Sequence, residues 1–176
     1  MASKIKVDKL ETADGTGTIA LQNQLSGMTT ASLPTVTTDK LGAGAVLQVV
    51  SSIFETDTST SSTSYVTTGH SVTLTPSSTS SKVYVTLQGG GGWVAAGSWL
   101  KMTIYRGGTN LGNSNTFTAY SSSGDQNVSH SMAILDSPST TSATTYTIYF
   151  RTNTGTPQYR WSDKGNPVLT AMEIAG

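Results

Sequence analysis

The chain has 176 residues and a mass of 18.3 kDa, and its ten basic and ten acidic residues give a formal net charge of zero. A charged fraction of only 11% argues against a disordered chain, and the basic residues form no run that would suit nucleic acid. Cysteine is absent, which excludes disulfides and thiolate chemistry. No apolar stretch approaches the ~18 residues of a membrane span. We therefore expect neither a nucleic-acid partner nor membrane insertion.

Residues 1–44 are predicted to form an N-terminal extended β arm. Two short apolar sets flank a turn signal at residues 14–17. Two short strands cannot bury a core alone, so this arm needs partners, and we expect it to serve attachment and oligomerisation. The alternative is a flexible tail. The residues predicted to carry attachment are Ile5, Val7, Leu10, Ile19, Leu21 and Leu25.

Residues 45–176 are predicted to form an antiparallel β-sandwich of jelly-roll type. Serine and threonine supply 25 and 31 residues, and in residues 71–75 and 83–87 hydroxyl and apolar side chains alternate. Alternation is typical of strands with one apolar face and one solvated face. Turn-forming clusters, including glycines 89–92, separate the predicted strands. These strands are 45–55, 64–75, 82–88, 98–106, 114–120, 126–135, 144–152, 158–162 and 167–174.

Few side chains suggest catalysis or metal binding. His70 and His130 are the only histidines, and neither has a partner at metal-ligand spacing. His130 shares one side of its predicted strand with Val128, Met132 and Ile134, so we expect a semi-buried or interface residue. The acidic residues fall mostly in turns or at strand ends, and no nucleophile elbow occurs. We expect a protein that is not an enzyme and has no cofactor.

The glycine run and four aromatic residues are the remaining features of note. Glycines 89–92 are not followed by the lysine and hydroxyl residue of a phosphate loop, so they predict a bend or a close backbone approach. The aromatic residues are candidates to stack on sugar rings, and they are equally suited to be core or interface anchors. They are Trp93, Trp99, Tyr159 and Trp161.

Several segments resemble one family. At the start they are ASKIKVDKLET (2–12) and GTGTIAL (15–21), and further along VLQVV (46–50), SSTSYV (61–66), LTPSSTSSKV (74–83) and LTAMEI (169–174). In this order the segments resemble fibre-like virion proteins of marine tailed phages, cyanophages in particular. Residues 89–165 carry no matching motif.

The resemblance implies a homotrimeric virion component that assembles in the host cytoplasm. Its N-terminal arm would attach to other virion proteins of the capsid or tail, and its β domain would be exposed. The expected function is that of a short tail fibre, a head fibre or a capsid decoration protein. The alternative is a module that recognises a glycan on the host surface.

Overall fold

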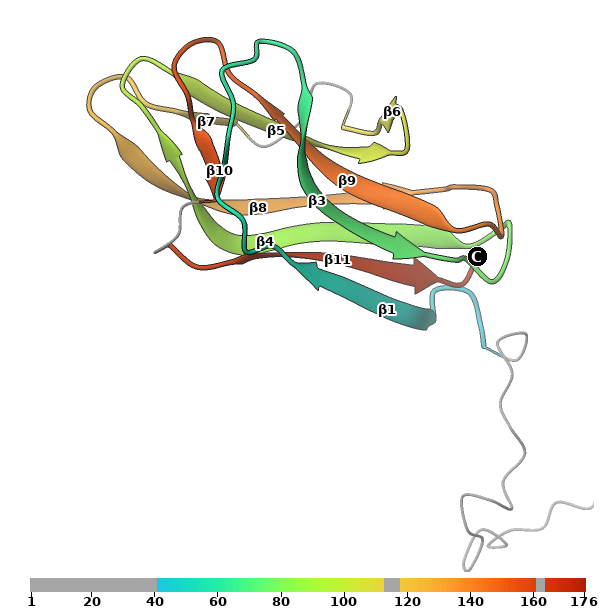
Figure 1. Ribbon diagram of the computed structural model, residues 1–176. Helices are drawn as coiled ribbons and strands as arrows, with labels where there is room; N and C mark the ends of the chain where they lie inside the picture. The colour runs from blue at the N-terminus through green and yellow to red at the C-terminus, as the bar shows by residue number, and fades with distance from the viewer. Residues whose placement is uncertain (1–40, 113–117, 161–163) are drawn as a thin grey trace, which may run out of the picture. The chain divides into compact units, whose positions relative to one another are not determined.

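The computed structural model describes residues 41–112, 118–160 and 164–176. These residues form two antiparallel sheets that face each other across one core, and no helix occurs among them (Figure 1). The predicted all-β sandwich is therefore confirmed. The residues predicted to carry attachment all lie outside the described residues; they are Ile5, Val7, Leu10, Ile19, Leu21 and Leu25.

Eleven strands make up the two sheets in the described part of the chain. Sheet A contains β1 (Val46–Ile53), β2 (Thr58–Ser59), β4 (Lys82–Val94), β8 (Gln126–Asp136), β10 (Gln158–Arg160) and β11 (Pro167–Ile174). Sheet B contains β3 (Val66–Leu74), β5 (Trp99–Arg106), β6 (Thr109–Asn110), β7 (Thr118–Tyr120) and β9 (Thr144–Arg151).

The strand order is that of a jelly roll. In sheet A, β8 pairs with one edge of β4 from Val83 to Val94. Along the opposite edge of β4, β11 pairs with residues 82–89 and β10 pairs with Trp93. The main order is therefore β1-β11-β4-β8 in sheet A and β3-β9-β5-β7 in sheet B. The chain crosses between the sheets repeatedly, from β2 to β3, β3 to β4, β4 to β5, β7 to β8, β8 to β9 and β9 to β10, as in the double-sheet jelly roll.

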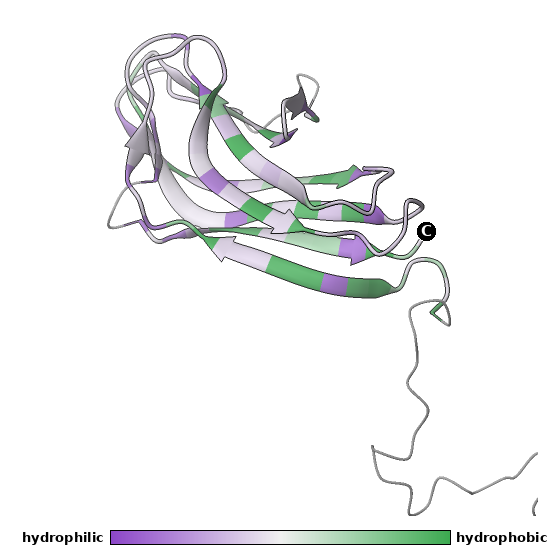
Figure 2. Cartoon of the chain, turned by 45° about the vertical axis from the view of Figure 1, so that its right-hand side comes forward, coloured by the Kyte–Doolittle hydropathy of each residue, from purple (hydrophilic) through white to green (hydrophobic). Residues whose placement is uncertain are grey.

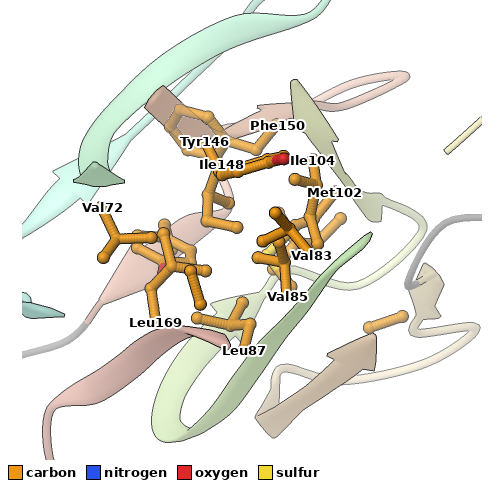
Figure 3. Close-up of a cluster of buried hydrophobic side chains, with 14 of the residues drawn as sticks. Val72, Val83, Val85, Leu87, Met102, Ile104, Tyr146, Ile148, Phe150 and Leu169 are labelled. Carbon is orange, nitrogen blue, oxygen red and sulfur yellow. The ribbon is translucent and has the colours of Figure 1, made fainter. Parts of the chain in front are cut away.

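In the segments where hydroxyl and apolar residues alternate, the apolar side chains lie in the core of this sandwich. Val72 and Leu74 are buried while Thr73 and Thr75 are exposed, as the alternation predicts. The buried side chains of the two sheets point toward one another (Figure 3). Among them are Val83, Val85, Leu87 and Leu169 from sheet A, and Met102, Ile104, Tyr146, Ile148 and Phe150 from sheet B.

Glycines 89–92 lie inside β4, so the prediction that a turn ends this strand before them is wrong. The predicted close backbone approach is confirmed. A Cβ on Gly90 would lie 2.5 Å from the nitrogen of Pro167, and a Cβ on Gly92 would lie 2.5 Å from the carbonyl oxygen of Gln158. Gly89 and Gly90 have φ values of 73° and 65°, and they form a bulge where β4 passes from β11 to β10. Glycine lets the segment after residue 157 cross close to β4.

Candidate interaction surfaces

The three aromatic candidates for sugar stacking that the structure describes do not form one site. Trp99 begins β5 with 38% of its surface exposed, whereas Trp93 is half-buried in β4. Tyr159 is 0% exposed, so the suggestion that it stacks on a sugar does not fit its position. Trp161 lies outside the described residues.

Tyr159 instead lies at the centre of a buried cluster with both histidines. The ring of His130 stacks on Tyr159 at 5.1 Å, and its Nε2–H donates to the Tyr159 carbonyl oxygen at 2.5 Å. His70 Nε2–H donates to the Ser52 carbonyl oxygen at 2.9 Å. His70 Nδ1 therefore accepts the hydrogen bond from the Tyr159 hydroxyl, at 2.7 Å. The ring of Phe54 stacks on the ring of His70, with the two ring centres 5.1 Å apart.

This environment keeps both histidines neutral. Burial lowers the pKa of His70 and of His130, and the hydrogen bonds to backbone carbonyls only partly oppose it. Burial also raises the pKa of the Tyr159 hydroxyl, which stays protonated as a donor. The cluster joins β3, β8 and β10, so its role is to hold the two sheets together. His130 lies on the inward side of β8 with Met132, as the sequence predicts.

Glu173 is a buried carboxylate that joins three of the segments carrying the family resemblance. Its Oε1 accepts from the Ser77 backbone N–H, the Ser77 hydroxyl and the Ser81 hydroxyl, each at 2.7 Å. Its Oε2 accepts from Gln48 Nε2 at 2.6 Å. Burial raises the pKa of this carboxyl, but the hydrogen bonds more than offset it, so the pKa lies below its usual value.

Asp136, the last residue of β8 in sheet A, connects the two sheets. Its two oxygens lie 2.9 and 2.8 Å from Nη1 of Arg106, and the hydroxyl of Tyr146 donates to Oδ2 at 2.8 Å. Both buried carboxylates thus have structural partners. Among the residues that the structure describes, no group of histidine, aspartate and glutamate is placed to hold a metal ion, and no helix could cross a membrane.

The outer face of sheet A carries an unpredicted line of apolar side chains. Val49 pairs with Met172, Met172 with Tyr84, and Tyr84 with Leu135, so the four side chains run side by side across β1, β11, β4 and β8. We call these four residues the apolar row. Val49 is 57% exposed, Leu135 55% and Tyr84 38%.

The apolar row departs from the pattern of residues 71–75 and 83–87, where hydroxyl side chains occupy the solvated face. One row further along the same sheet, Ser51, Thr170 and Thr86 follow the expected pattern. Beyond them β1 again exposes an apolar side chain, Ile53, and Val46 is exposed at its start. Hydrophobic colour accordingly covers much of β1, the lowest strand in Figure 2. Because β1 is an edge strand of sheet A, its apolar side chains adjoin a backbone edge with which no other described strand pairs.

The outer face of sheet B is aromatic and cationic. At one end Trp99 packs edge-on against Tyr120 at 6.2 Å, with Lys101 Nζ 4.4 Å from the Trp99 ring centre. At the other end the rings of Tyr105 and Tyr149 stack at 4.0 Å. We call this surface the aromatic face; its six residues are Trp99, Lys101, Tyr105, Tyr120, Tyr149 and Arg151.

Three solved structures resemble this chain distantly. They are infectious bursal virus-derived T=1 particles, the infectious bursal disease virus VP2 subviral particle and the Gx strain of infectious bursal disease virus, with 14%, 14% and 13% identity and TM-scores of 0.36, 0.36 and 0.34. The similarity covers 82%, 82% and 81% of this chain but only 41%, 42% and 41% of those chains. This chain thus spans about two fifths of their length. No protein-family model and no curated protein matches the sequence.

Proposed function

We propose that the chain is a non-enzymatic structural protein of a tailed-phage virion, a short fibre or a decoration protein that acts as a homotrimer. Residues 1–44 would attach it to other capsid or tail proteins, and the jelly roll would be exposed. Assembly would take place in the host cytoplasm. The buried acids Glu173 and Asp136 and the two histidines are engaged in structural hydrogen bonds, which fits a role without catalysis.

The apolar row is the observation that carries this proposal. It extends across four strands of sheet A and ends on the edge strand β1, which also exposes Val46 and Ile53. Exposed apolar rows and strand edges promote association, so this surface favours contact between copies. A net charge of zero removes long-range repulsion between copies. A second and a third copy of this chain would cover the row.

The family resemblance supports the same role from a different part of the molecule. Three of the segments that carry it, residues 46–50, 74–83 and 169–174, meet at the Glu173 carboxylate. These three segments therefore form one connected corner of the jelly roll. The backbone N–H of Gly44 donates to the carbonyl oxygen of Ala175 at 2.8 Å, so the chain enters the domain at this corner.

The trimer is tested by measuring the solution mass of the full chain and of Leu135→Lys. We expect the wild-type mass to be near three times 18.3 kDa. Leu135→Lys should reduce it to that of one chain, since a lysine cannot be buried in an apolar contact without a partner. Because Leu135 is 55% exposed, the lysine leaves the fold of a single chain intact.

The matched control is Ser129→Lys, which lies six residues away on the same face of β8, about 20 Å along the strand. It should keep the trimer mass. A folded wild-type monomer, or a Leu135→Lys trimer, would contradict the role of the apolar row. Deleting residues 1–40 tests the arm separately: the shortened protein should be folded but absent from particles, and its incorporation would contradict the arm's role in attachment.

A further inference from the structure

We infer that the aromatic face of sheet B is a binding surface for an anionic glycan, a sugar chain that carries carboxylate or sulfate groups. This inference goes beyond the proposed virion role and does not depend on it. The aromatic face belongs to sheet B and the apolar row to sheet A, so each can be tested without the other.

The shape of the surface suits an extended chain. Trp99 and Tyr105 both project outward from β5 and are six residues apart, so they are separated by about 20 Å. Lys101 and Arg151 lie opposite one another in the pairing of β5 with β9, between these two aromatic groups. The Lys101 ammonium lies over the Trp99 ring, and the Arg151 guanidinium lies 5.0 Å from the centre of the Tyr65 ring and donates to the Thr63 carbonyl oxygen at 3.2 Å, so each cation adjoins an aromatic ring.

The charge of this face is one-sided. The strands of sheet B, Val66–Leu74, Trp99–Arg106, Thr109–Asn110, Thr118–Tyr120 and Thr144–Arg151, contain no aspartate or glutamate. Their three cations are Lys101, Arg106 and Arg151, and Arg106 is neutralised by its ion pair with Asp136. The outer face thus keeps two positive charges without an acidic neighbour on these strands. Such a surface attracts anions.

The remaining chemistry of the face favours a sugar. Tyrosine and tryptophan offer flat apolar surfaces with a polar edge, which suits the C–H face of a pyranose ring. Lysine and arginine make charge-assisted hydrogen bonds to carboxylate or sulfate oxygens. Outward hydroxyls on the same strands, Thr118 and Thr147, can exchange hydrogen bonds with sugar hydroxyls. Neutral sugars would use the rings but leave the two cations without counter-charges.

The test is calorimetric titration of the full chain with three oligosaccharides of equal length. They are an oligogalacturonate, a heparin-derived sulfated fragment and an uncharged maltooligosaccharide. We expect at least one anionic probe to bind at least ten times more tightly than the uncharged one, and the comparison of the two anionic probes separates carboxylate from sulfate recognition. Lys101→Gln and Tyr120→Ser should each weaken binding about tenfold. Tyr120 is 54% exposed, so its replacement leaves the fold intact.

Lys82→Gln is the matched control, because it removes one lysine from the outer face of sheet A instead. Its affinity should equal that of the wild type. Failure of both anionic probes to bind, equal binding of the uncharged probe, or equal weakening by Lys82→Gln and Lys101→Gln would each overturn the assignment. None of these results bears on the trimer mass, so the two proposals fail separately.

Discussion

Substitution of Gly92 by alanine tests how closely the segment around Gln158 approaches β4. The new Cβ would lie 2.5 Å from the Gln158 carbonyl oxygen and 2.9 Å from Cε1 of His130, while ordinary contact begins at 3.4 Å. The carbonyl would have to retreat by about 0.9 Å and the ring by about 0.5 Å. Both are fixed, since Gln158 pairs with Trp93 and His130 is hydrogen-bonded to Tyr159.

The cost of this movement can be estimated from its parts. Overpacking of a buried site costs about 1–3 kcal/mol. Weakening the hydrogen bond from His130 to the Tyr159 carbonyl adds about 1 kcal/mol. We therefore expect a loss of about 3 kcal/mol in the free energy of unfolding. For a domain of this size that corresponds to a fall in Tm of about 6–12 °C.

Thermal and urea unfolding followed by circular dichroism would measure this loss. Gly108→Ala is the control, because nothing lies within 4 Å of its Cβ and its φ is not positive. It should leave Tm unchanged or raise it slightly, since alanine restricts the unfolded chain. A Gly92→Ala protein with the Tm of the wild type would refute the close approach.

Two further predictions concern the buried ionisable groups. Glu173→Gln should lower the free energy of unfolding by about 2–4 kcal/mol in urea titrations, because four hydrogen bonds lose a charged acceptor. The control Glu55→Gln, at an exposed residue, should change it by less than about 0.5 kcal/mol. Equal effects of the two substitutions would contradict a stabilising role of the Glu173 hydrogen bonds. The pKa values of His70 and His130 are lowered in the folded protein, so below pH 6.5, the usual histidine pKa, the unfolded chain binds more protons than the folded one. The free energy of unfolding should therefore fall as the pH drops from 6.5 to 5, by up to about 1.4 kcal/mol per pH unit for each histidine. Urea midpoints that stay constant or rise over this range would show that the histidines are not buried and neutral.

The fold could be predicted because its strands follow simple alternation. In residues 71–75 and 83–87 one face is apolar and the other hydroxylic, and the structure buries the apolar face. The strand at glycines 89–92 could not be predicted, since glycine normally interrupts strands. Here it is needed for contacts with residues 158–167, which no local pattern reveals. The two-residue strands β2 and β6 were missed because so short a segment has no periodicity.

The surfaces were harder to predict than the fold. Tyr159 is close to Trp161 in sequence, and an aromatic side chain of this kind can stack on a sugar ring. In the structure, however, it is fully buried between Phe54 and the two histidines. The apolar row combines Val49 and Leu135, which are distant in sequence and come together only through strand register. A signal did exist at residues 46–50, where four of five residues are apolar without alternation.

The measurement that tests the virion role most directly is quantitative mass spectrometry of purified particles from cells that produce this chain. Peptides of the chain should remain with particles after gradient purification, in a constant ratio to the major capsid protein. They should be lost from particles when residues 1–40 are deleted. Abundant chain in the lysate together with its absence from intact particles would contradict a structural role in the virion.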